Sequence, residues 1–240
     1  MRIFLGSALA LGLGLGFLDA SARPWLFGAF IGSLALVGYT LWDETRGRAA
    51  RVASLRKRWL EFGAIERDSL PTSPRPTGLD RGDLHLMQDG QPIVVRISLL
   101  KDVPTVAVLT PLPETTTAFR IASRHHPRPS FDGIEPALRG AALEALPGVG
   151  ATLGSAFHVE GNDPTRLLRL LDEALADALA HADLHHRDTF RGLTFDGRFL
   201  AVHWLGDDLA SDPMGALAMA APFWRPFIPR LPPIPRELLN

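Results

Sequence analysis

The stretch Leu84–Leu99, LHLMQDGQPIVVRISL, decides the fold of the larger part of the chain. Its flanks, Leu84–Met87 and Ile93–Leu99, are rich in apolar and β-branched residues, which is typical of strands. Asp89 and Gly90 between them tolerate positive φ angles and favour a tight hairpin turn. The stretch therefore predicts two antiparallel strands joined by that turn.

Short strands and helices follow in irregular order. We expect further strands over residues 105–110, 116–123, 157–160, 188–195 and 198–205, and helices over residues 135–146 and 211–224. A meander is the simplest connection for the first strands, and Pro147-Gly148 is expected to end the first helix. Hairpin-linked strands with helices between the groups predict an α+β domain of antiparallel strands with two or three packed helices.

The clearest helix of this domain begins at Asn162-Asp163-Pro164. Asp163 suits the N-cap and Pro164 suits the first helical turn. Apolar residues then recur at helical spacing and form one face: Leu167, Leu168, Leu171, Leu175, Ala178, Leu179 and Ala182. We expect this face to pack on the sheet.

Two apolar segments precede the domain. Ile3–Leu18 has 16 residues and Trp25–Trp42 has 18. A helix needs about 20 apolar residues to cross a bilayer, with about 17 as the lower limit. Because Asp19–Arg23 forms a polar break between them, the segments predict a transmembrane helical hairpin. The alternative is a cleaved signal peptide over residues 1–22, followed by one membrane helix.

Glycines at a four-residue spacing lie in both apolar segments: Gly12 and Gly16 in the first, Gly28 and Gly32 in the second. This spacing lets two helix backbones approach closely in lipid, so it predicts packing within the hairpin or between subunits. The alternative is that glycine is simply common in membrane helices.

A basic amphipathic segment over residues 43–68 follows. Val52, Leu55, Trp59 and Phe62 recur at steps of three and four residues, as on one face of a helix. The cations of the segment are Arg46, Arg48, Arg51, Arg56, Lys57 and Arg58. Because positive residues stay in the cytoplasm, they predict an integral membrane protein with the bulk of the chain on the cytoplasmic side. They either bind anionic lipid headgroups or act only as this topology signal.

The composition narrows the class of protein. The net charge of -1 lacks the basic excess of a nucleic-acid binder. The absence of cysteine excludes disulfides and cysteine-ligated metals. The predicted organisation is a transmembrane hairpin (1–42), a juxtamembrane helix (43–68), a proline-rich linker (69–78), an α+β domain (79–228) and a proline-rich tail (229–240).

Chemical signals are sparse. His181 and His185 lie four residues apart on the predicted helix, where two imidazoles can share a divalent metal. The alternative is a pair of histidines at the core edge near a helix C-terminus, because no glutamate completes an H-E-x-x-H motif. The glycines of residues 148–154 follow no strand, so no nucleotide site and no cofactor are predicted.

Three aromatic residues, Phe223, Trp224 and Phe227, precede the proline-rich tail. They either dock the tail on the core or form an anchor for a partner or the bilayer.

The sequence therefore contains clear signals for membrane attachment and no comparable signal for catalysis. We predict a membrane-anchored protein-binding or assembly module, an accessory subunit of a larger membrane complex that presents its α+β domain to the cytoplasm. Its expected partners are membrane lipid, a protein and other membrane subunits. The sequence favours a non-enzymatic role, and the alternative is a membrane-attached, metal-dependent hydrolase that uses the His-x-x-x-His pair.

Overall fold

The computed structural model describes residues 23–67, 83–88, 90–100, 102–112, 115–127 and 143–224. Side chains are described from Phe30 onward, except at residues 150–152. The contacts divide the chain into two units, Met1–Arg51 and Val52–Asn240. The second unit holds the α+β domain, and helix α2 (Arg23–Glu61) passes from the first unit into the second.

The predicted transmembrane hairpin has no support from the described residues. Its first segment, Ile3–Leu18, lies outside them, and its second segment, Trp25–Trp42, falls within the single helix α2. Within the described part of the chain, no helix is long and apolar enough to cross a membrane.

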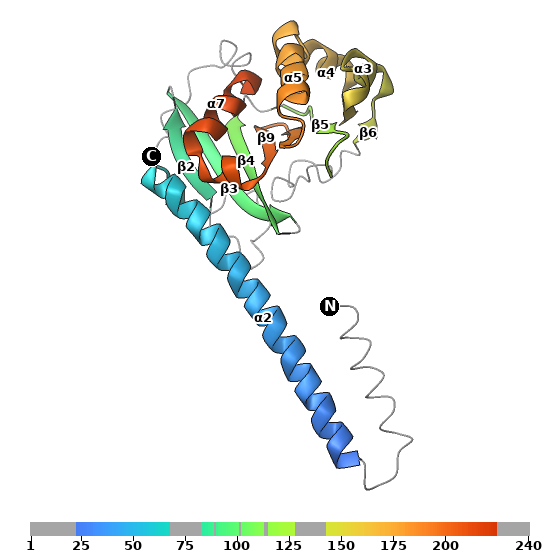
Figure 1. The fold of residues 1–240 in the computed structure, drawn as a ribbon. Helices are drawn as coiled ribbons and strands as arrows, with labels where there is room; N and C mark the ends of the chain where they lie inside the picture. Colours follow the sequence, from blue (N-terminus) through green and yellow to red (C-terminus); the bar gives the residue numbers. More distant parts are fainter. Residues whose placement is uncertain are drawn as a thin grey trace. The chain divides into compact units, whose positions relative to one another are not determined.

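The second unit is built on one nine-stranded sheet in which every pairing is antiparallel (Figure 1). Its strands are β1 (Ile65–Arg67), β2 (Asp83–Gln88), β3 (Gln91–Leu100), β4 (Val103–Pro111), β5 (Phe119–Ser123), β6 (Glu144–Ala145), β7 (Phe157–Gly161), β8 (Phe190–Phe195) and β9 (Phe199–Leu205). Their order is β1-β2-β3-β4-β9-β8-β5-β7-β6. The predicted α+β class with antiparallel strands is confirmed.

The meander predicted for the first strands ends at β4. Strands β2, β3 and β4 are sequential neighbours, but β4 then pairs with β9 instead of β5. The β4–β9 ladder contains seven residue pairs, whereas β5 is only five residues long and could form at most five pairs. The longer strand pairs more of the buried β4 backbone, and β5 lies between β8 and β7.

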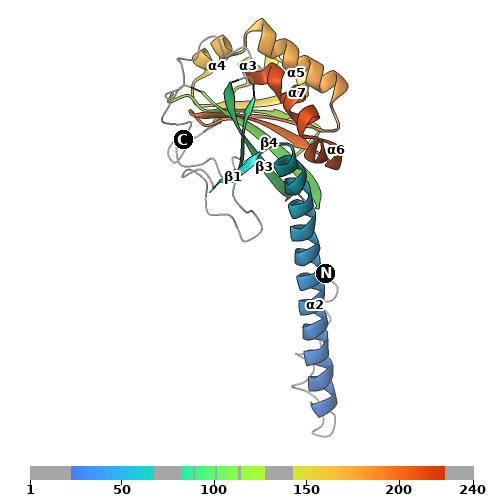
Figure 2. The same cartoon turned by 90° about the vertical axis from the view of Figure 1, so that its left-hand side faces the viewer.

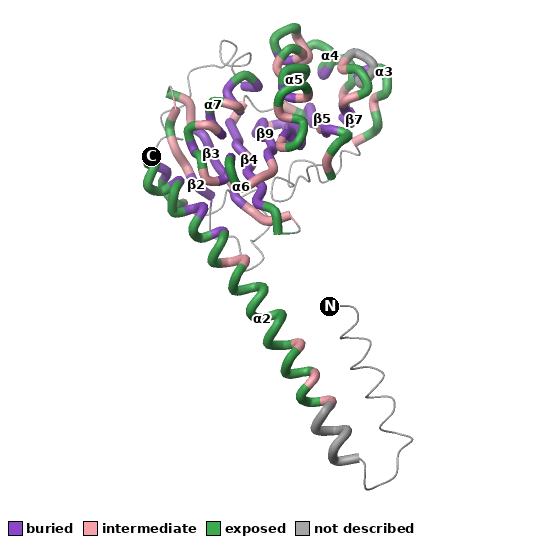
Figure 3. The backbone as a smooth tube through the Cα atoms, viewed as in Figure 1, coloured by how far each residue is buried: buried purple, intermediate pink, exposed green. Residues whose placement is uncertain are grey.

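Helices cover one face of this sheet. They are α3 (Pro147–Thr152), α4 (Pro164–Leu170), α5 (Glu173–His185), α6 (Asp207–Ser211) and α7 (Pro213–Trp224), with the short 3₁₀ helix η1 (Gly154–Ala156). Figure 2 shows α4, α5 and α7 lying along the same face. Figure 3 shows the buried residues concentrated on the strands and on the helix surfaces that face them.

The helix predicted from Asp163 is two helices. Asp163 Oδ1 caps α4 by accepting from the Arg166 N–H at 2.9 Å, and this cap was predicted. Asp172 Oδ1 accepts from the Leu175 N–H at 3.0 Å and caps a second helix, α5. Because this aspartate satisfies the free donors of a new first turn, the chain breaks at Leu171 and restarts.

Proline explains two further differences. The predicted helix over 135–146 is wrong at its end, because Glu144–Ala145 is strand β6 and Pro147 begins α3 instead of ending a helix. Residues 128–142 lie outside the described residues. The helix predicted over 211–224 is α7, which begins at Pro213, and the short helix α6 before it was not predicted; the two are separated at Asp212, since Pro213 disfavours helical geometry in the preceding residue.

The amphipathic face predicted around Trp59 packs on the α+β domain itself. Val52, Leu55 and Trp59 are buried, and Trp59 is fully inaccessible. The Trp59 indole N–H donates to the Ala210 carbonyl at 2.9 Å. The helix ends at Glu61 and β1 follows, so the predicted juxtamembrane helix of residues 43–68 is shorter than expected and is the continuation of α2.

Replacing Trp59 with alanine should lower the free energy of unfolding by about 3–5 kcal/mol, because a fully buried tryptophan and its hydrogen bond are lost. Chemical denaturation measures this change. The neighbouring Leu60 is 39% exposed, and Leu60→Ala is expected to change stability by no more than about 0.5 kcal/mol. Similar losses for both variants would contradict the packing of this helix end on the domain.

Candidate functional site

Large apolar side chains are exposed along α2 within the first unit. Six of them are between 37% and 61% exposed: Ile31, Leu34, Leu36, Tyr39, Leu41 and Trp42. At 100° per residue these positions cover an arc of about 220° of the helix, and they form what we call the α2 apolar surface. A helix whose apolar side chains cover so wide an arc is typical of lipid or of a protein interior.

The glycines predicted to pack helices are only partly described. No described atom lies within 4 Å of a Cβ built on Gly32. Gly28 lies on the same helix, and its surroundings are not described, while Gly12 and Gly16 lie outside the described residues. Helix packing through the four glycines therefore stays a prediction.

Arg56 differs from the other predicted surface cations because it is a structural residue. Its side chain is buried, and its Nη2 lies 2.9 Å from Glu66 Oε1, which joins the end of α2 to β1. The Glu66 side chain is 43% exposed, so water screens this ion pair on one side. Arg56 is thus not available to lipid headgroups.

The remaining predicted cations are more accessible. The Arg46 guanidinium lies 5.1 Å from the Trp42 ring centroid, and Lys57 Nζ lies 3.6 Å from Glu61 Oε1. Arg51 and Arg58 are exposed and Arg48 is half-buried. Their role as headgroup ligands or topology signals stays a prediction.

A groove of about 460 Å³ lies between α5 and α7. Most of its lining is apolar, and the small side chains of its alanines leave the space between the two helices open. It is lined by Ala174, Asp177, Ala178, His181, Ala182 and His186 from the α5 side, by Ala218, Met219, Pro222 and Phe223 from α7, and by Trp204 from β9. We call this concave region the α5–α7 groove.

Trp204 forms part of the groove lining and is almost fully buried. Its ring centroid lies 5.0 Å from that of Phe190 and 6.1 Å from that of His186. Its indole N–H finds no acceptor among the residues that the structure describes. This N–H is inaccessible to solvent and so lies beneath the surface of the groove.

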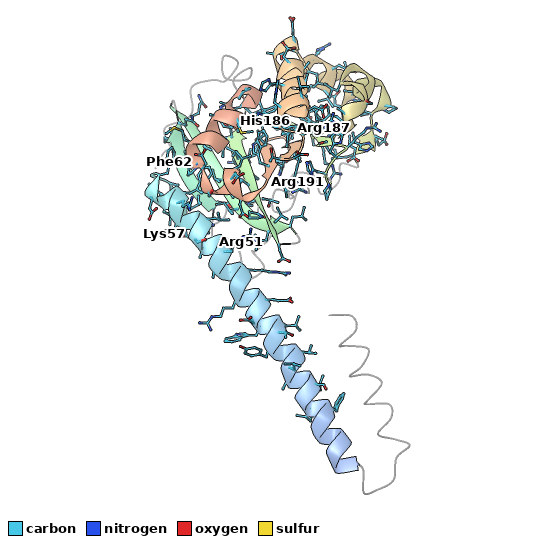
Figure 4. All side chains as sticks on the ribbon, in the orientation of Figure 1. Arg51, Lys57, Phe62, His186, Arg187 and Arg191 are labelled. Carbon is cyan, nitrogen blue, oxygen red and sulfur yellow. The ribbon has the colours of Figure 1, made fainter. Side chains whose placement is uncertain are left out.

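The predicted metal pair lies at the edge of this groove. The ring centroids of His181 and His185 are 4.4 Å apart, and those of His181 and His186 are 5.7 Å apart (His186 is labelled in Figure 4). Burial, and then the nearby His181 and His185, lower the pKa of His186. In the described part of the chain, no group of three or more histidine or acidic side chains is arranged to hold a metal.

The loop histidines contact the same end of α5 without joining the metal pair. His125 Nε2 lies 3.4 Å from Asp183 Oδ1, and His126 Nε2 lies 2.6 Å from the Arg187 carbonyl. A third metal ligand for His181 and His185 would have to come from such a loop. The structure brings the loop to α5, but both of its histidine rings contact other groups.

Two of the three aromatic residues near the C-terminus are part of the core. Phe223 and Trp224 are 2% and 4% exposed, and Phe223 stacks on Phe190 with a centroid distance of 5.2 Å. Neither of these two is therefore an exposed anchor, and the docking of the tail stays a prediction. Phe227 lies outside the described residues.

The opposite face of the sheet contains a buried polar row that the sequence did not reveal. The pairing registers place Ala107 of β4 between Arg96 and His203, and Arg96 and Arg120 are half-buried; the polar members of the row are Asp83, Arg96, His203, Thr194, Arg120 and Glu160. Arg96 donates to Asp83 at 2.9 and 2.8 Å, and Arg120 Nε donates to Glu160 at 2.8 Å. The charges of the row are thus arranged in ion pairs.

His203 lies at the centre of this row. Its Nε2 lies 2.7 Å from Thr194 Oγ1. Burial, assisted by the positive charges of Arg191, Arg96 and Arg120, lowers the pKa of His203 to about 3. A single titratable residue in the apolar strand Phe199–Leu205 was the sequence signal that could have identified it.

The stability of the domain should fall in mild acid because of His203. An unfolded histidine binds its proton near pH 6.5, whereas the folded His203 stays neutral to about pH 3. Between these values the unfolded chain binds more protons, so unfolding becomes easier as the pH falls. We expect His203→Gln to remove about 2 kcal/mol of the stability difference between pH 7 and pH 5.

Chemical denaturation at the two pH values measures this difference. His185→Gln is the matched control, because His185 is exposed and its replacement leaves His203 and its surroundings in place. An identical pH dependence in natural chain and His203→Gln would contradict the assignment.

Comparisons with known proteins complete the description of the candidate sites. No family model matches the sequence, and no curated protein matches it. Among solved structures, the chain is similar to the crystal structure of the mycobacterial trehalose monomycolate transport factor A, TtfA, with 12% sequence identity and a TM-score of 0.47. The similarity covers 79% of this chain and 99% of that chain. A similarity of this size carries no argument about activity or partners.

Proposed function

We propose that the chain is a membrane-attached accessory protein, anchored through its N-terminal apolar segments, which presents its α+β domain to a protein partner on the cytoplasmic side. The observation that carries the proposal is the α2 apolar surface. It supports the proposal because six large apolar side chains in twelve residues, Ile31–Trp42, stand exposed over an arc of about 220° of one helix.

The energetic argument favours hydrocarbon as the environment of this surface. Exposed apolar area costs about 25 cal/mol per Å² relative to burial. A narrow stripe would suit packing on one protein face, whereas exposed apolar side chains over about 220° of the helix suit a medium that surrounds most of it. The apolar segment also continues in sequence from Trp25 to Trp42, and Ile3–Leu18 offers a second segment to pair with it.

The charge pattern supports the proposed orientation. Arg46, Arg48 and Arg51 follow directly after Trp42, where cytoplasmic cations flank a membrane segment. Trp42 and Tyr39, with ring centroids 6.2 Å apart, are residue types that prefer the interface between hydrocarbon and headgroups. A cytoplasmic α+β domain follows from this orientation.

A binding role fits the domain better than hydrolysis. The described residues provide no third ligand for the His181–His185 pair, so no observation favours the metal-dependent hydrolase. An accessory subunit needs attachment and a stable presented surface, and the chain offers both an apolar helix and a well-packed sheet.

Replacing Leu36 with arginine should weaken the attachment of the full chain to membranes and raise its fraction in the supernatant. A central arginine costs about 2.5–3.5 kcal/mol in a membrane helix, which shifts the chain from the pellet to the supernatant of an alkaline membrane extraction. Thr45→Arg on the same helix, beyond the apolar segment, is the control and should stay in the pellet. A natural chain found entirely in the supernatant would refute membrane attachment.

The glycines offer a separate test of complex formation. If α2 packs against other membrane subunits, Gly28→Leu combined with Gly32→Leu should separate the backbones and release the chain from the complex on a native gel. Gly38→Leu is the matched control, because Gly38 lies in the same apolar segment on another side of the helix. Unchanged migration of the double variant would show that these glycines hold no partner.

A further inference from the structure

His181 and His185 form an exposed pair on one face of α5. They lie four residues apart, so their side chains project from successive turns on the same side of the helix. Their ring centroids are 4.4 Å apart, with an angle of 44° between the ring planes. Both residues are exposed, so two imidazoles are held side by side with open access from solvent.

The two rings have no polar partner that would compete with a ligand. Over the described ranges, neither His181 nor His185 makes a hydrogen bond or an ion pair through its ring. The neighbouring His186 is different, because its ring packs edge-on against Trp204 with a centroid distance of 6.1 Å. The loop histidines contact other groups as well. The pair is therefore free of polar contacts, whereas the histidines around it are engaged by the domain.

The electrostatic surroundings favour a cation at this pair. Helix α5 contains three acidic residues and no lysine or arginine, and one of the acids, Asp177, lies one turn before His181 on the same side. His185 is the last residue of the helix, where the partial negative charge of the C-terminal end stabilises cations. Arg187, beyond the helix end, lies 3.6 Å from Asp183, so its positive charge is paired. A divalent ion beside the two rings is thus favoured by its charge.

The chemistry of two imidazoles restricts the kind of ion. Imidazole nitrogen is a common ligand of Zn²⁺, Cu²⁺ and Ni²⁺, whereas Mg²⁺ and Ca²⁺ prefer oxygen ligands. The pair fills two coordination positions, because no third ligand joins it among the residues that the structure describes. A catalytic zinc ion normally has three protein ligands. The arrangement therefore fits the reversible binding of an ion better than a permanently held catalytic metal.

We propose that His181 and His185 form a two-ligand binding site on α5 for a late first-row divalent metal ion: Cu²⁺, Ni²⁺ or Zn²⁺. The bound ion links successive turns near the end of the helix, and it therefore stabilises the last turn of α5. Because His181 also lines the α5–α7 groove, the ion lies at the rim of that groove. The proposal does not depend on membrane attachment, since both ligands belong to the α+β domain.

Cu²⁺ is the probe for the test, because it binds nitrogen ligands most tightly among these ions. The full chain is purified in detergent without a histidine tag, and the bound Cu²⁺ is measured by equilibrium dialysis near neutral pH. We expect this site to bind one ion per chain. His181→Gln and His185→Gln should each weaken its binding at least about tenfold, because the loss of even a supporting residue costs a metal site about 10–100-fold in affinity.

His125→Gln is the matched control. It also removes one histidine near the end of α5, and it leaves the pair intact. The affinity of this variant for Cu²⁺ should equal that of the natural chain. Equal affinities in the natural chain and in both pair variants would overturn the proposal. A loss in His125→Gln as large as in His181→Gln would assign the ion to the loop and would overturn it as well.

Two further readouts separate this site from general binding to surface histidines. The electron paramagnetic resonance spectrum of the bound Cu²⁺ should show coupling to two imidazole nitrogens in the natural chain and to one in either pair variant. Amide hydrogen exchange in the last turn of α5 should slow on addition of Cu²⁺ in the natural chain and in His125→Gln, but not in the pair variants. A spectrum with fewer than two imidazole nitrogens in the natural chain would refute the two-histidine site.

Discussion

The ladder between β4 and β9 holds the two halves of the sheet together. Seven residue pairs, from Thr105 with Leu205 to Pro111 with Phe199, join the first strands to the group that contains β8, β5 and β7. Because side chains alternate along a strand, neighbouring residues of β9 serve opposite faces. Trp204 packs under the helices and lines the groove, whereas His203 lies in the polar row on the other face. Both features therefore depend on the register of this one ladder.

The polar row explains why that register is unique. A slip of one residue would move every side chain to the opposite face and would place the Arg96–Asp83 pair in the apolar core. Breaking a buried ion pair costs about 3–5 kcal/mol, which is a large share of the stability of a domain. Buried ion pairs add little net stability by themselves, but here they penalise the wrong pairing. We interpret the row as a device for specificity of the sheet, with His203 kept neutral by its surroundings.

Local signals were sufficient for the elements and insufficient for their arrangement. Alternation and turn residues identified the strands around Asp89-Gly90, and the cap at Asp163 identified the start of a helix. The pairing of β4 with β9 could not be predicted, because it joins residues about ninety positions apart and depends on competition among all strands. The break at Asp172 was missed because the apolar spacing continues across it. The groove was missed because it arises from alanines of two helices and a tryptophan of a strand, which only tertiary structure brings together.

The two apolar regions of the molecule that face outward differ in shape and in the polar groups that they present. The α2 apolar surface is convex, and its members Tyr39 and Trp42 also carry a hydroxyl and an indole N–H, so an environment that covers it must leave these two groups near water or near an acceptor. The α5–α7 groove is concave, and its aromatic floor at Trp204 is almost fully buried beneath it. Because alanines from α5 and α7 leave little side-chain volume between the two helices, the groove follows from the same packing that buries Phe223 and Trp204 in the core.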